Sequence, residues 1–272
     1  MAASVESSGA PEVSIVVCSI DAGKFARVSA NYRSLFAARA IEIVGIHDAR
    51  SLAEGYTRGI AQSRGMRLIL SHDDIEILTP DFAARLDRHL ADFDLIGIAG
   101  TTRLVAGKWA AAGDPYVFAL VTSPDPEAGG YQTMMLGGGP LVVPRIVALD
   151  GVFMALRRDV AMTIPFDAET FDGFHLYDLD FSFRTHRAGF RLAVCRDIVL
   201  IHDSTGSYDA AWEDYRRRFE AKHRDALASI PKPKVGARAA FAAATREEVL
   251  RRCDIAKLEN VARRIEHANA TR

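Results

Sequence analysis

The first hundred residues alternate between short apolar runs and amphipathic stretches, and this alternation constrains the fold more than any other feature of the sequence. The apolar runs are rich in β-branched residues and lack a helical period, so they indicate buried strands. The amphipathic stretches place apolar residues three or four positions apart, as helices do. Because strand–helix alternation needs crossover connections, it predicts an α/β fold with a mostly parallel central sheet flanked by helices. We expect strands at 13–19, 41–46, 67–70 and 95–99, and helices at 25–38, 52–63 and 80–93.

The alternation breaks between residues 100 and 144, which contain three consecutive glycines at 137–139 and several prolines. This stretch indicates a long irregular or β-hairpin insertion, and such insertions in compact domains are usually functional or mobile. The chain divides into a disordered leader at 1–12, a main domain at 13–230 and a C-terminal helical extension at 231–272. Later strands are expected at 146–156, 191–194 and 198–201, and later helices at 177–188, 212–228 and 246–268.

Composition excludes several classes of protein. The formal net charge is −1, with 25% charged and 49% hydrophobic residues, so no overall basic field recruits nucleic acid. The three cysteines are too few and too widely spaced for a metal clip or a disulfide framework, which favours a reducing cytoplasm. No apolar stretch approaches the ~20 residues that a membrane span needs. The first residues also lack the basic and apolar regions of a secretory signal.

The end of the third expected strand carries the first candidate site. Residues 71–74 read SerHisAspAsp, and two adjacent carboxylates at a strand end repel each other and gain no packing. Asp73 and Asp74 would suit an oxygen-ligand site for Mg²⁺ or Mn²⁺. The alternative is a loop in which one of the two carboxylates caps a turn.

Two further polar clusters lie later in the chain, one near a helix start and one directly after an apolar strand. Residues 172–180 hold His175, Asp178 and Asp180, and Asp178 is either a helix N-terminal cap or a general base above a substrate. Residues 201–208 begin with His202, which is either a metal ligand or an ordinary polar loop residue, in a Ser/Thr/Gly loop able to cradle phosphate.

Asp48 and Arg58 are lesser candidates. Asp48 follows the second expected strand, where a carboxylate can accept from a base or a ribose, and Arg58 lies on the next helix. Capping and a solvated charge explain them equally well. The sequence lacks GxxxxGK[ST], GxGxxG, HExxH and GxSxG, which argues against P-loop, dinucleotide, zinc-protease and hydrolase functions.

Taken in order, five segments resemble the family 2-like glycosyltransferases with the GT-A nucleotide-diphospho-sugar transferase fold, and most closely the streptomycin-biosynthesis-type glycosyltransferase-like domain. The resemblance covers about residues 13–208 and implies that fold for this chain. The segments are GluGlyTyrThrArgGlyIle (54–60), LeuSerHisAspAspIleGlu (70–76), AspGlyValPheMetAlaLeuArgArg (150–158), PheHisLeuTyrAspLeuAspPheSerPheArg (174–184) and LeuIleHisAspSer (200–204).

The resemblance implies a metal-dependent, inverting glycosyltransferase of the hexosyltransferase type, acting in bacterial polysaccharide or glycoconjugate biosynthesis. Its donor would be a UDP-, GDP- or dTDP-linked sugar, its acceptor a sugar or a lipid-linked molecule, and its cofactor Mn²⁺ or Mg²⁺. The glycines at 137–139 and the insertion around them would close over the acceptor. By position, the implied roles are metal binding for Asp74 and His202, catalytic base for Asp178, and substrate binding for Ser19, Asp48, Arg58, Asp73, Gly151, His175 and Asp180.

The chain departs from the family pattern at three positions. His72 stands where many relatives have the first acid of the metal motif, Thr57 where relatives often have Asn, and Tyr177 where the wider family has Glu before the base. These departures keep open a non-catalytic relative that binds a nucleotide or sugar, or an assembly subunit. A nucleotidyltransferase would need a basic loop after the first strand, and that loop offers only Lys24.

The C-terminal part is basic and ends in an amphipathic helix. Residues 212–272 contain 15 Lys and Arg against 9 Asp and Glu, an excess of +6. An apolar stripe needs a partner surface, which could be the main domain, a second subunit or a membrane. Packing within the chain or across a homodimer is favoured, and a peripheral contact with the inner membrane face stays open. The stripe consists of Val249, Cys253, Ala256, Leu258, Val261 and Ile265.

Overall fold

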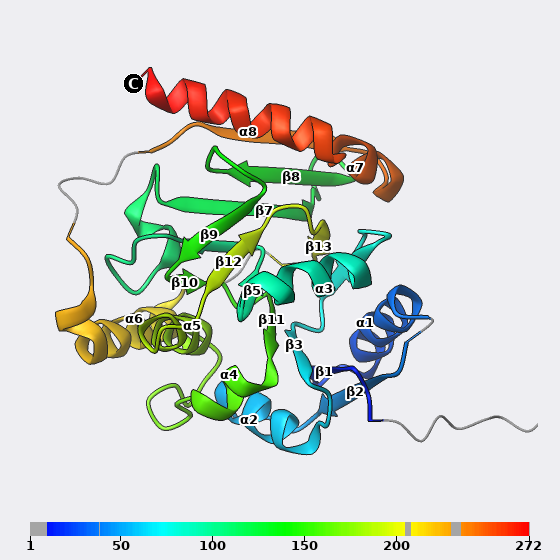
Figure 1. Ribbon diagram of the computed structural model, residues 1–272, viewed down its shortest axis with the longest axis vertical. Helices are drawn as coiled ribbons and strands as arrows, with labels where there is room; N and C mark the ends of the chain where they lie inside the picture. The colour runs from blue at the N-terminus through cyan, green and yellow to red at the C-terminus, as the bar shows by residue number, and fades with distance from the viewer. Residues whose placement is uncertain (1–9, 38, 205–207, 230–234, 272) are drawn as a thin grey trace, which may run out of the picture.

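The computed structural model describes residues 10–37, 39–204, 208–229 and 235–271. It contains two β-sheets, and helices cover both faces of the first (Figure 1). The expected leader and the break at 231–234 lie largely or wholly outside the described residues. The helices are α1 (Ala22–Leu35), α2 (Leu52–Gln62), α3 (Phe82–Asp92), η1 (Trp109–Ala112), α4 (Arg158–Thr163), α5 (Tyr177–Arg187), α6 (Ala210–His223), η2 (Arg224–Ala226), α7 (Arg246–Arg252) and α8 (Ile255–Ala270).

The first sheet has the order β2-β1-β3-β11-β5-β12-β9. β1 is parallel to β2 and β3, and β12 is parallel to β5, whereas β11 and β9 are antiparallel to their neighbours. The expected mostly parallel sheet is therefore confirmed. Its strands are β1 (Val13–Cys18), β2 (Ile41–Ile46), β3 (Arg67–Ser71), β5 (Leu95–Gly97), β9 (Val142–Ile146), β11 (Phe153–Arg157) and β12 (Leu192–Cys195).

Alternate side chains of the first sheet enter two separate cores. Along β3, Leu68 and Leu70 pack with Tyr56 of α2 and Phe181 of α5, whereas Ile69 packs on the opposite face with α1 and α3. All of these side chains are fully buried, as the two-residue period of a strand with both faces covered requires. Because both faces of the sheet are packed, the carboxyl ends of β1 and β3 are held in fixed positions.

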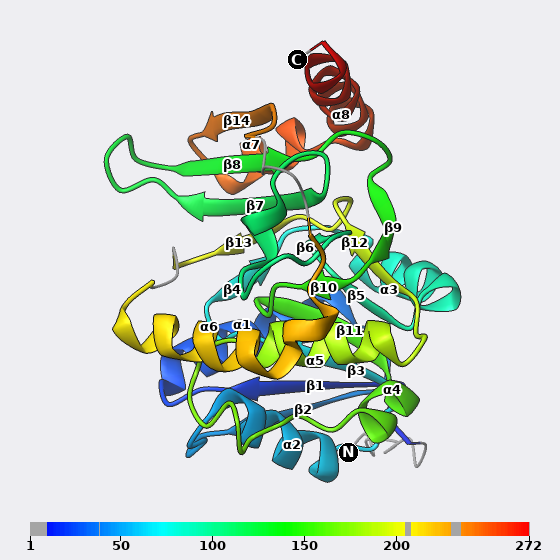
Figure 2. The ribbon, with the colours of Figure 1, turned by 90° about the vertical axis from the view of Figure 1, so that its left-hand side faces the viewer.

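The second sheet was only partly expected. It has the order β10-β6-β7-β13-β4, and β8 and β14 extend it beyond β7. The expected hairpin inside the insertion is β7 with β8, and Figure 2 shows it standing above the first sheet. The strands are β4 (Ile75–Ile77), β6 (Ala99–Thr101), β7 (Val117–Pro124), β8 (Tyr131–Leu136), β10 (Ala148–Leu149), β13 (Leu200–His202) and β14 (Arg238–Ala243).

Two expected strands are wrong as single elements. The strand expected at 95–99 is divided between the sheets, with β5 in the first and β6 in the second. The strand expected at 146–156 is likewise divided, because Asp150 and Gly151 form a turn between β10 and β11. AspGly is a strong turn dipeptide, and its signal was outweighed by the apolar residues on either side.

The C-terminal segment belongs to the second sheet and is not purely helical. β14 pairs antiparallel with β8, and α7 and α8 pack over the same strands (Figure 2). Val249, Cys253, Leu258 and Ile265 are at most 5% exposed, so most of the apolar stripe packs within the chain. Val261 is half-buried, and Ala256 is exposed and does not belong to the buried face. Among the described residues, no helix is both long and apolar enough to cross a membrane.

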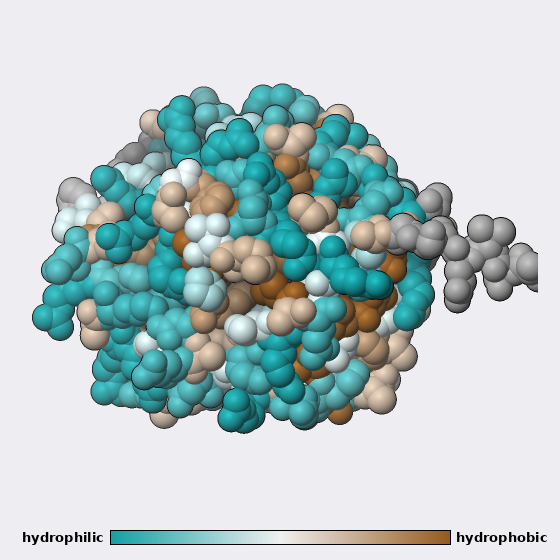
Figure 3. All heavy atoms as spheres, turned by 60° about the horizontal axis from the view of Figure 1, so that its bottom comes forward, coloured by the Kyte–Doolittle hydropathy of each residue, from teal (hydrophilic) through white to brown (hydrophobic). Residues whose placement is uncertain are grey.

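β2 is one of the two outer strands of the first sheet, and within the described part of the chain it pairs with β1 alone. Figure 3 shows the face that carries β2 and α2, with apolar side chains gathered toward its middle and right inside a polar surround. Met66, just before β3, and Met162 in α4 are 70% and 69% exposed.

Candidate functional site

The metal-ligand candidates come together because β4 pairs with β13. His72 and Asp74 lie in the turn between β3 and β4, and His202 ends β13 opposite Ile75. The backbone N–H of Asp203 also donates to the carbonyl of Asp74 at 2.9 Å. The short strand β4 was not expected from the sequence, yet it holds the two candidate segments side by side.

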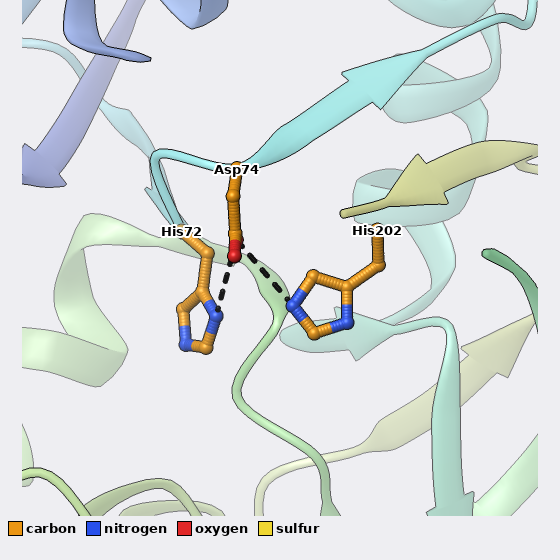
Figure 4. Close-up of side chains that lie close together, drawn as sticks. All are labelled: His72, Asp74 and His202. Atoms are coloured by element: carbon orange, nitrogen blue, oxygen red, sulfur yellow. Dashed lines mark ion pairs between the residues drawn. The ribbon is translucent and has the colours of Figure 1, made fainter. Parts of the chain in front are cut away.

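The carboxylate of Asp74 points between two imidazoles (Figure 4). Its Oδ1 lies 3.4 Å from His202 Nε2 and 3.9 Å from His72 Nδ1, and the three ligand atoms are all within 4.8 Å of one another. Oδ1 is buried and accepts no hydrogen bond from any described residue. A buried oxygen left without a donor beside two imidazole nitrogens fits a divalent cation, because burying it unpaired is otherwise costly. His72 thus joins the ligand set that the sequence analysis assigned to Asp74 and His202.

The surroundings favour the ionised carboxylate of Asp74 and the neutral imidazole of His72, the forms that bind a metal. Burial would raise the pKa of Asp74, but the imidazole of His202 beside its Oδ1, together with the charge of His72, lowers it to about 2. Burial, and next the charge of His202, lowers the pKa of His72. Its other nitrogen, Nε2, lies 3.1 Å from the hydroxyl of Tyr177, which fixes the ring with Nδ1 toward Asp74. Two departures from the family pattern, His72 and Tyr177, therefore contact each other.

Asp178 begins α5 immediately after a residue in an unusual conformation. Leu176 has φ of 60°, in the left-handed region that favours glycine, and it is the N-cap residue of α5. The Gly151 N–H donates to Asp178 Oδ2 at 2.7 Å. A Cβ on Gly151 would lie 2.6 Å from Asp178 Cβ, so only glycine fits there. Gly151 therefore supports the carboxylate. It also lines the same cavity as Asp178, and its predicted contact with substrate stays a prediction.

Asp150 is a site residue that the sequence analysis missed. Its Oδ1 accepts from the Val152 N–H at 3.1 Å and its Oδ2 from the Trp109 indole N–H at 2.9 Å. Burial and then the charge of Asp150 raise the pKa of Asp178 to about 7, although backbone N–H groups pull it the other way. The AspGly turn signal inside the expected strand could have identified it.

Two neighbouring cavities meet at the metal-ligand cluster. One, of about 240 Å³, is lined by Asp150, Asp178, His72 and His202 together with aromatic side chains from η1 and α6. The other, of about 230 Å³, lies at the ends of β1 and β2. His72 and Phe174 line both. The second cavity is also lined by Cys18, Ser19, Ile20, Ile46, Ala49, Leu52, Asp73 and Asp74.

Two of the predicted substrate-binding residues lie in the second cavity and two lie apart from both. Ser19 donates to Asp73 Oδ2 at 2.6 Å on the wall of the second cavity. Asp48 and Arg58 instead pair with each other at 2.8 Å, and neither lines the two cavities. The charge and hydrogen bond of Arg58 lower the pKa of Asp48.

His175 lines the first cavity, with Nε2 4.0 Å from Asp209 Oδ1. Ser204 Oγ lies 3.2 Å from His202 Nε2, and Ser204 and Tyr208 line the same cavity. The predicted phosphate loop between them, residues 205–207, lies outside the described residues.

Asp180 is not a substrate-binding residue in this fold, and that prediction is wrong. The side chain is 1% exposed, and Arg184 Nε, Lys222 Nζ and His223 Nε2 each lie 2.7 Å from its carboxylate oxygens. These groups lower its pKa against the raising effect of burial. Asp180 joins α5 to α6 and has no path to a ligand.

The glycines at 137–139 do not close over the cavities. The guanidinium of Arg196, which is wholly buried, donates to the carbonyls of Leu136 through Pro140. A Cβ on Gly138 would lie 2.6 Å from Cβ of Glu266 in α8. The turn is thus held in the second sheet, and a different part of the insertion, around Trp109, reaches the first cavity.

Comparisons with known proteins give a family and a fold. A family model described as "Glycosyltransferase like family" matches residues 14–223. None of the curated proteins matches the chain. A mannosyltransferase from Pyrobaculum calidifontis, solved with GDP-Man and Mn²⁺, is 12% identical, and the match covers 97% of this chain and 76% of that one with a TM-score of 0.50. At this identity the likeness concerns the fold alone.

Two other solved structures match with TM-scores below 0.5. GalNAc-T7, solved with UDP, GalNAc and Mn²⁺, is 11% identical over 78% of this chain and 48% of that one, with a TM-score of 0.42. TarS 1–349 from S. aureus is 12% identical over 79% of this chain and 73% of that one, with a TM-score of 0.41.

Proposed function

The chain belongs to the glycosyltransferase-like family whose model spans residues 14–223, and on this premise we propose that it moves a sugar from a nucleotide-diphospho-sugar to the hydroxyl group of an acceptor, with inversion and with a divalent cation. The family and the GT-A fold predicted from the sequence motifs are confirmed. One observation carries the proposal furthest. The ligand cluster His72, Asp74 and His202 lies where two cavities meet, and Asp178 lines one of them.

The arrangement of the cavities suggests how the substrates are placed. The cavity at the ends of β1 and β2 suits the nucleoside, because ligands of parallel sheets gather at the carboxyl ends of the strands. Ser19 and Asp73 there offer hydrogen-bonding groups to a ribose. The sugar and the acceptor hydroxyl then fall in the cavity that holds Asp178.

The metal-ligand atoms of the cluster favour Mn²⁺ over Mg²⁺. Two imidazoles and one carboxylate form the set, and Mg²⁺ prefers oxygen ligands, whereas imidazole suits transition metals better. A bound cation would neutralise charge on the leaving diphosphate. Tyr177 would keep the His72 ring in the orientation that binds the cation.

Asp178 is the proposed base. The acceptor oxygen forms a bond to the anomeric carbon as the bond from that carbon to the phosphate oxygen breaks, and the acceptor proton passes to a carboxylate oxygen of Asp178. A base with a pKa of about 7 is matched to work near neutral pH. A single displacement of this kind inverts the anomeric carbon.

Binding and transfer can be tested separately. Nucleoside diphosphates and nucleotide sugars, including UDP and GDP-mannose, would be tested for thermal stabilisation with Mn²⁺, Mg²⁺ or chelator, because a ligand of the native state raises stability. We expect one nucleotide to stabilise the protein more with Mn²⁺ than with Mg²⁺. Asp178→Asn should keep that binding and lose at least ~10²-fold in donor turnover, with Asp92→Asn on the exposed face of α3 as the matched control.

The outcome separates this function from a non-catalytic one. Nucleotide binding without any transfer or donor hydrolysis would favour a binding or assembly subunit. If no nucleotide stabilises the protein with any metal, the proposal fails.

A further inference from the structure

The carboxylate of Asp150 is held in place by hydrogen bonds and has no role in the function proposed above. Each of its oxygens accepts one hydrogen bond, from the Val152 backbone and from the Trp109 indole. The indole comes from η1, inside the long insertion, so a remote segment orients this carboxylate.

Asp150 lines the same cavity as Asp178, and the residue after Asp150 contacts Asp178. The next residue, Gly151, donates its N–H to Asp178 Oδ2 at 2.7 Å, and a Cβ on Gly151 would lie 3.0 Å from Asp178 Cγ. Both carboxylates line the same cavity of about 240 Å³. One tight turn therefore carries one carboxylate and touches the other.

Within the described residues, neither carboxylate of this pair forms an ion pair. Asp180, two residues after Asp178, shows the contrast, because Arg184, Lys222 and His223 surround it. Two carboxylates that share a cavity without a cation at contact distance disfavour double ionisation. The other titratable groups around Asp178, on its own helix and on the elements packed against it, are Tyr56, His72, Lys108, His175, Tyr177, His202 and Tyr208.

We infer that Asp150 is a positioning residue that keeps the Asp178 carboxyl able to take a proton at neutral pH. The inference rests on the proposed role of Asp178 as the base. The ionised Asp150 opposes loss of the proton from Asp178, second only to burial among the causes of its raised pKa. The Trp109 indole and the Val152 N–H hold the Asp150 carboxylate on the wall of the cavity, where its charge acts on Asp178, the proposed proton acceptor.

A titration of the protein itself tests this without any substrate. Aspartate carboxyl carbons would be labelled with ¹³C, and their shifts followed from pH 4 to 9 in chelator, with Asp178→Asn identifying the Asp178 signal. We expect a midpoint near 7, as its pKa indicates. Asp150→Asn should lower that midpoint by about one pH unit or more, and Asp92→Asn should leave it unchanged.

A second variant guards against a folding defect. Asp150→Ser also removes the charge and should give the same shift of the Asp178 midpoint. A midpoint that stays near 7 in a folded Asp150→Asn or Asp150→Ser protein overturns the inference, as does an Asp178 midpoint near 4 in the unmodified protein.

The pH profile of donor turnover provides the second readout. Its acidic limb should move to lower pH in Asp150→Asn by the same amount as the Asp178 midpoint, which a merely structural role would not produce. A shifted midpoint with no turnover in any variant would reject the proposed function and leave the coupling of the two carboxyls established. A shifted midpoint with an unmoved profile would overturn the positioning role.

Discussion

At the scale of single residues, the site depends on how polar groups are paired. Asp180 is surrounded by cations and is structural, whereas Asp178, two residues earlier, has none at contact distance among the described residues and faces a cavity. Asp74 leaves one buried oxygen without a donor. Three aspartates thus differ in role because their neighbours differ: Asp180 is ion-paired, Asp178 faces a cavity and Asp74 is a metal-ligand candidate.

The metal-ligand assignment predicts the effect of removing single ligands. Asp74→Ala and His72→Ala should each weaken Mn²⁺-dependent binding of a nucleoside diphosphate by at least tenfold, and Tyr177→Phe should weaken it less, within the ~10–100-fold range of outer-shell changes. Calorimetric titration with and without Mn²⁺ measures this. His267→Ala, an exposed histidine on α8, is the matched control. Unchanged Mn²⁺-dependent binding in Asp74→Ala would remove the assignment.

The raised pKa of Asp178 predicts that this residue costs stability above acidic pH. Between its ordinary pKa near 4 and its folded value of about 7, the folded state holds a proton that the unfolded state has lost, so stability falls as pH rises through this window. Asp178→Asn should therefore be more stable than the unmodified protein at pH 8, with a smaller difference at pH 4. Melting temperatures across pH 4 to 8 measure this, and a constant difference across that range would contradict it.

At the scale of elements, short strands and turns place the groups that matter. The three-residue β4 brings His202 to Asp74, and the turn between β10 and β11 brings Asp150 to Asp178. Arg196 stabilises another turn outside the two cavities, because it donates hydrogen bonds to the carbonyls of the glycines at 137–139.

Removal of the Arg196 guanidinium tests the structural role of that turn. Arg196→Met should lower the free energy of unfolding by about 3 kcal/mol, because it leaves several buried carbonyls without donors. Nucleotide binding should persist, since the turn lines neither cavity at the site. Urea unfolding measures the loss, with Arg88→Met on the exposed face of α3 as control. A loss no greater than that of the control would show that the turn does not depend on Arg196.

At the scale of the whole molecule, the C-terminal segment completes the second sheet. The apolar stripe of α7 and α8 packs within the chain, and several arginines of the basic excess are already paired. Arg216 contacts Glu213 and Glu220, and Arg218 contacts Asp172 and Asp214. The contact with a second subunit or a membrane stays a prediction, and the buried members of the stripe are already covered within the chain.

Truncation after Ile230 should therefore affect stability far more than nucleotide binding. It removes β14, α7 and α8 and exposes the apolar face of β8, including Met135. We expect a clearly lower melting temperature and a tendency to aggregate, with metal-dependent nucleotide binding retained in the soluble fraction. Calorimetry and light scattering measure this. An unchanged melting temperature and molar mass, with lost binding to anionic vesicles, would instead assign the segment to a membrane surface.

The sequence by itself determined the parts whose signal is local. Runs such as residues 13–19 are β-branched and apolar, and helices 52–63 and 177–188 have a clear period, so the first sheet and its helices follow from pattern alone. Strand ends and helix starts are also local features, which is why Asp74, His202 and Asp178 were candidates before their positions were known.

The tertiary structure alone decided which of those residues meet. The pairing of β4 with β13 made His72 a ligand candidate, and packing against α6 removed Asp180 from solvent. The sequence analysis placed Asp150 within a strand, whereas in the structure the next residue, Gly151, packs against Asp178. The physical reason is that strand pairing and burial join residues far apart in the chain, and such partners leave no periodic trace in either segment.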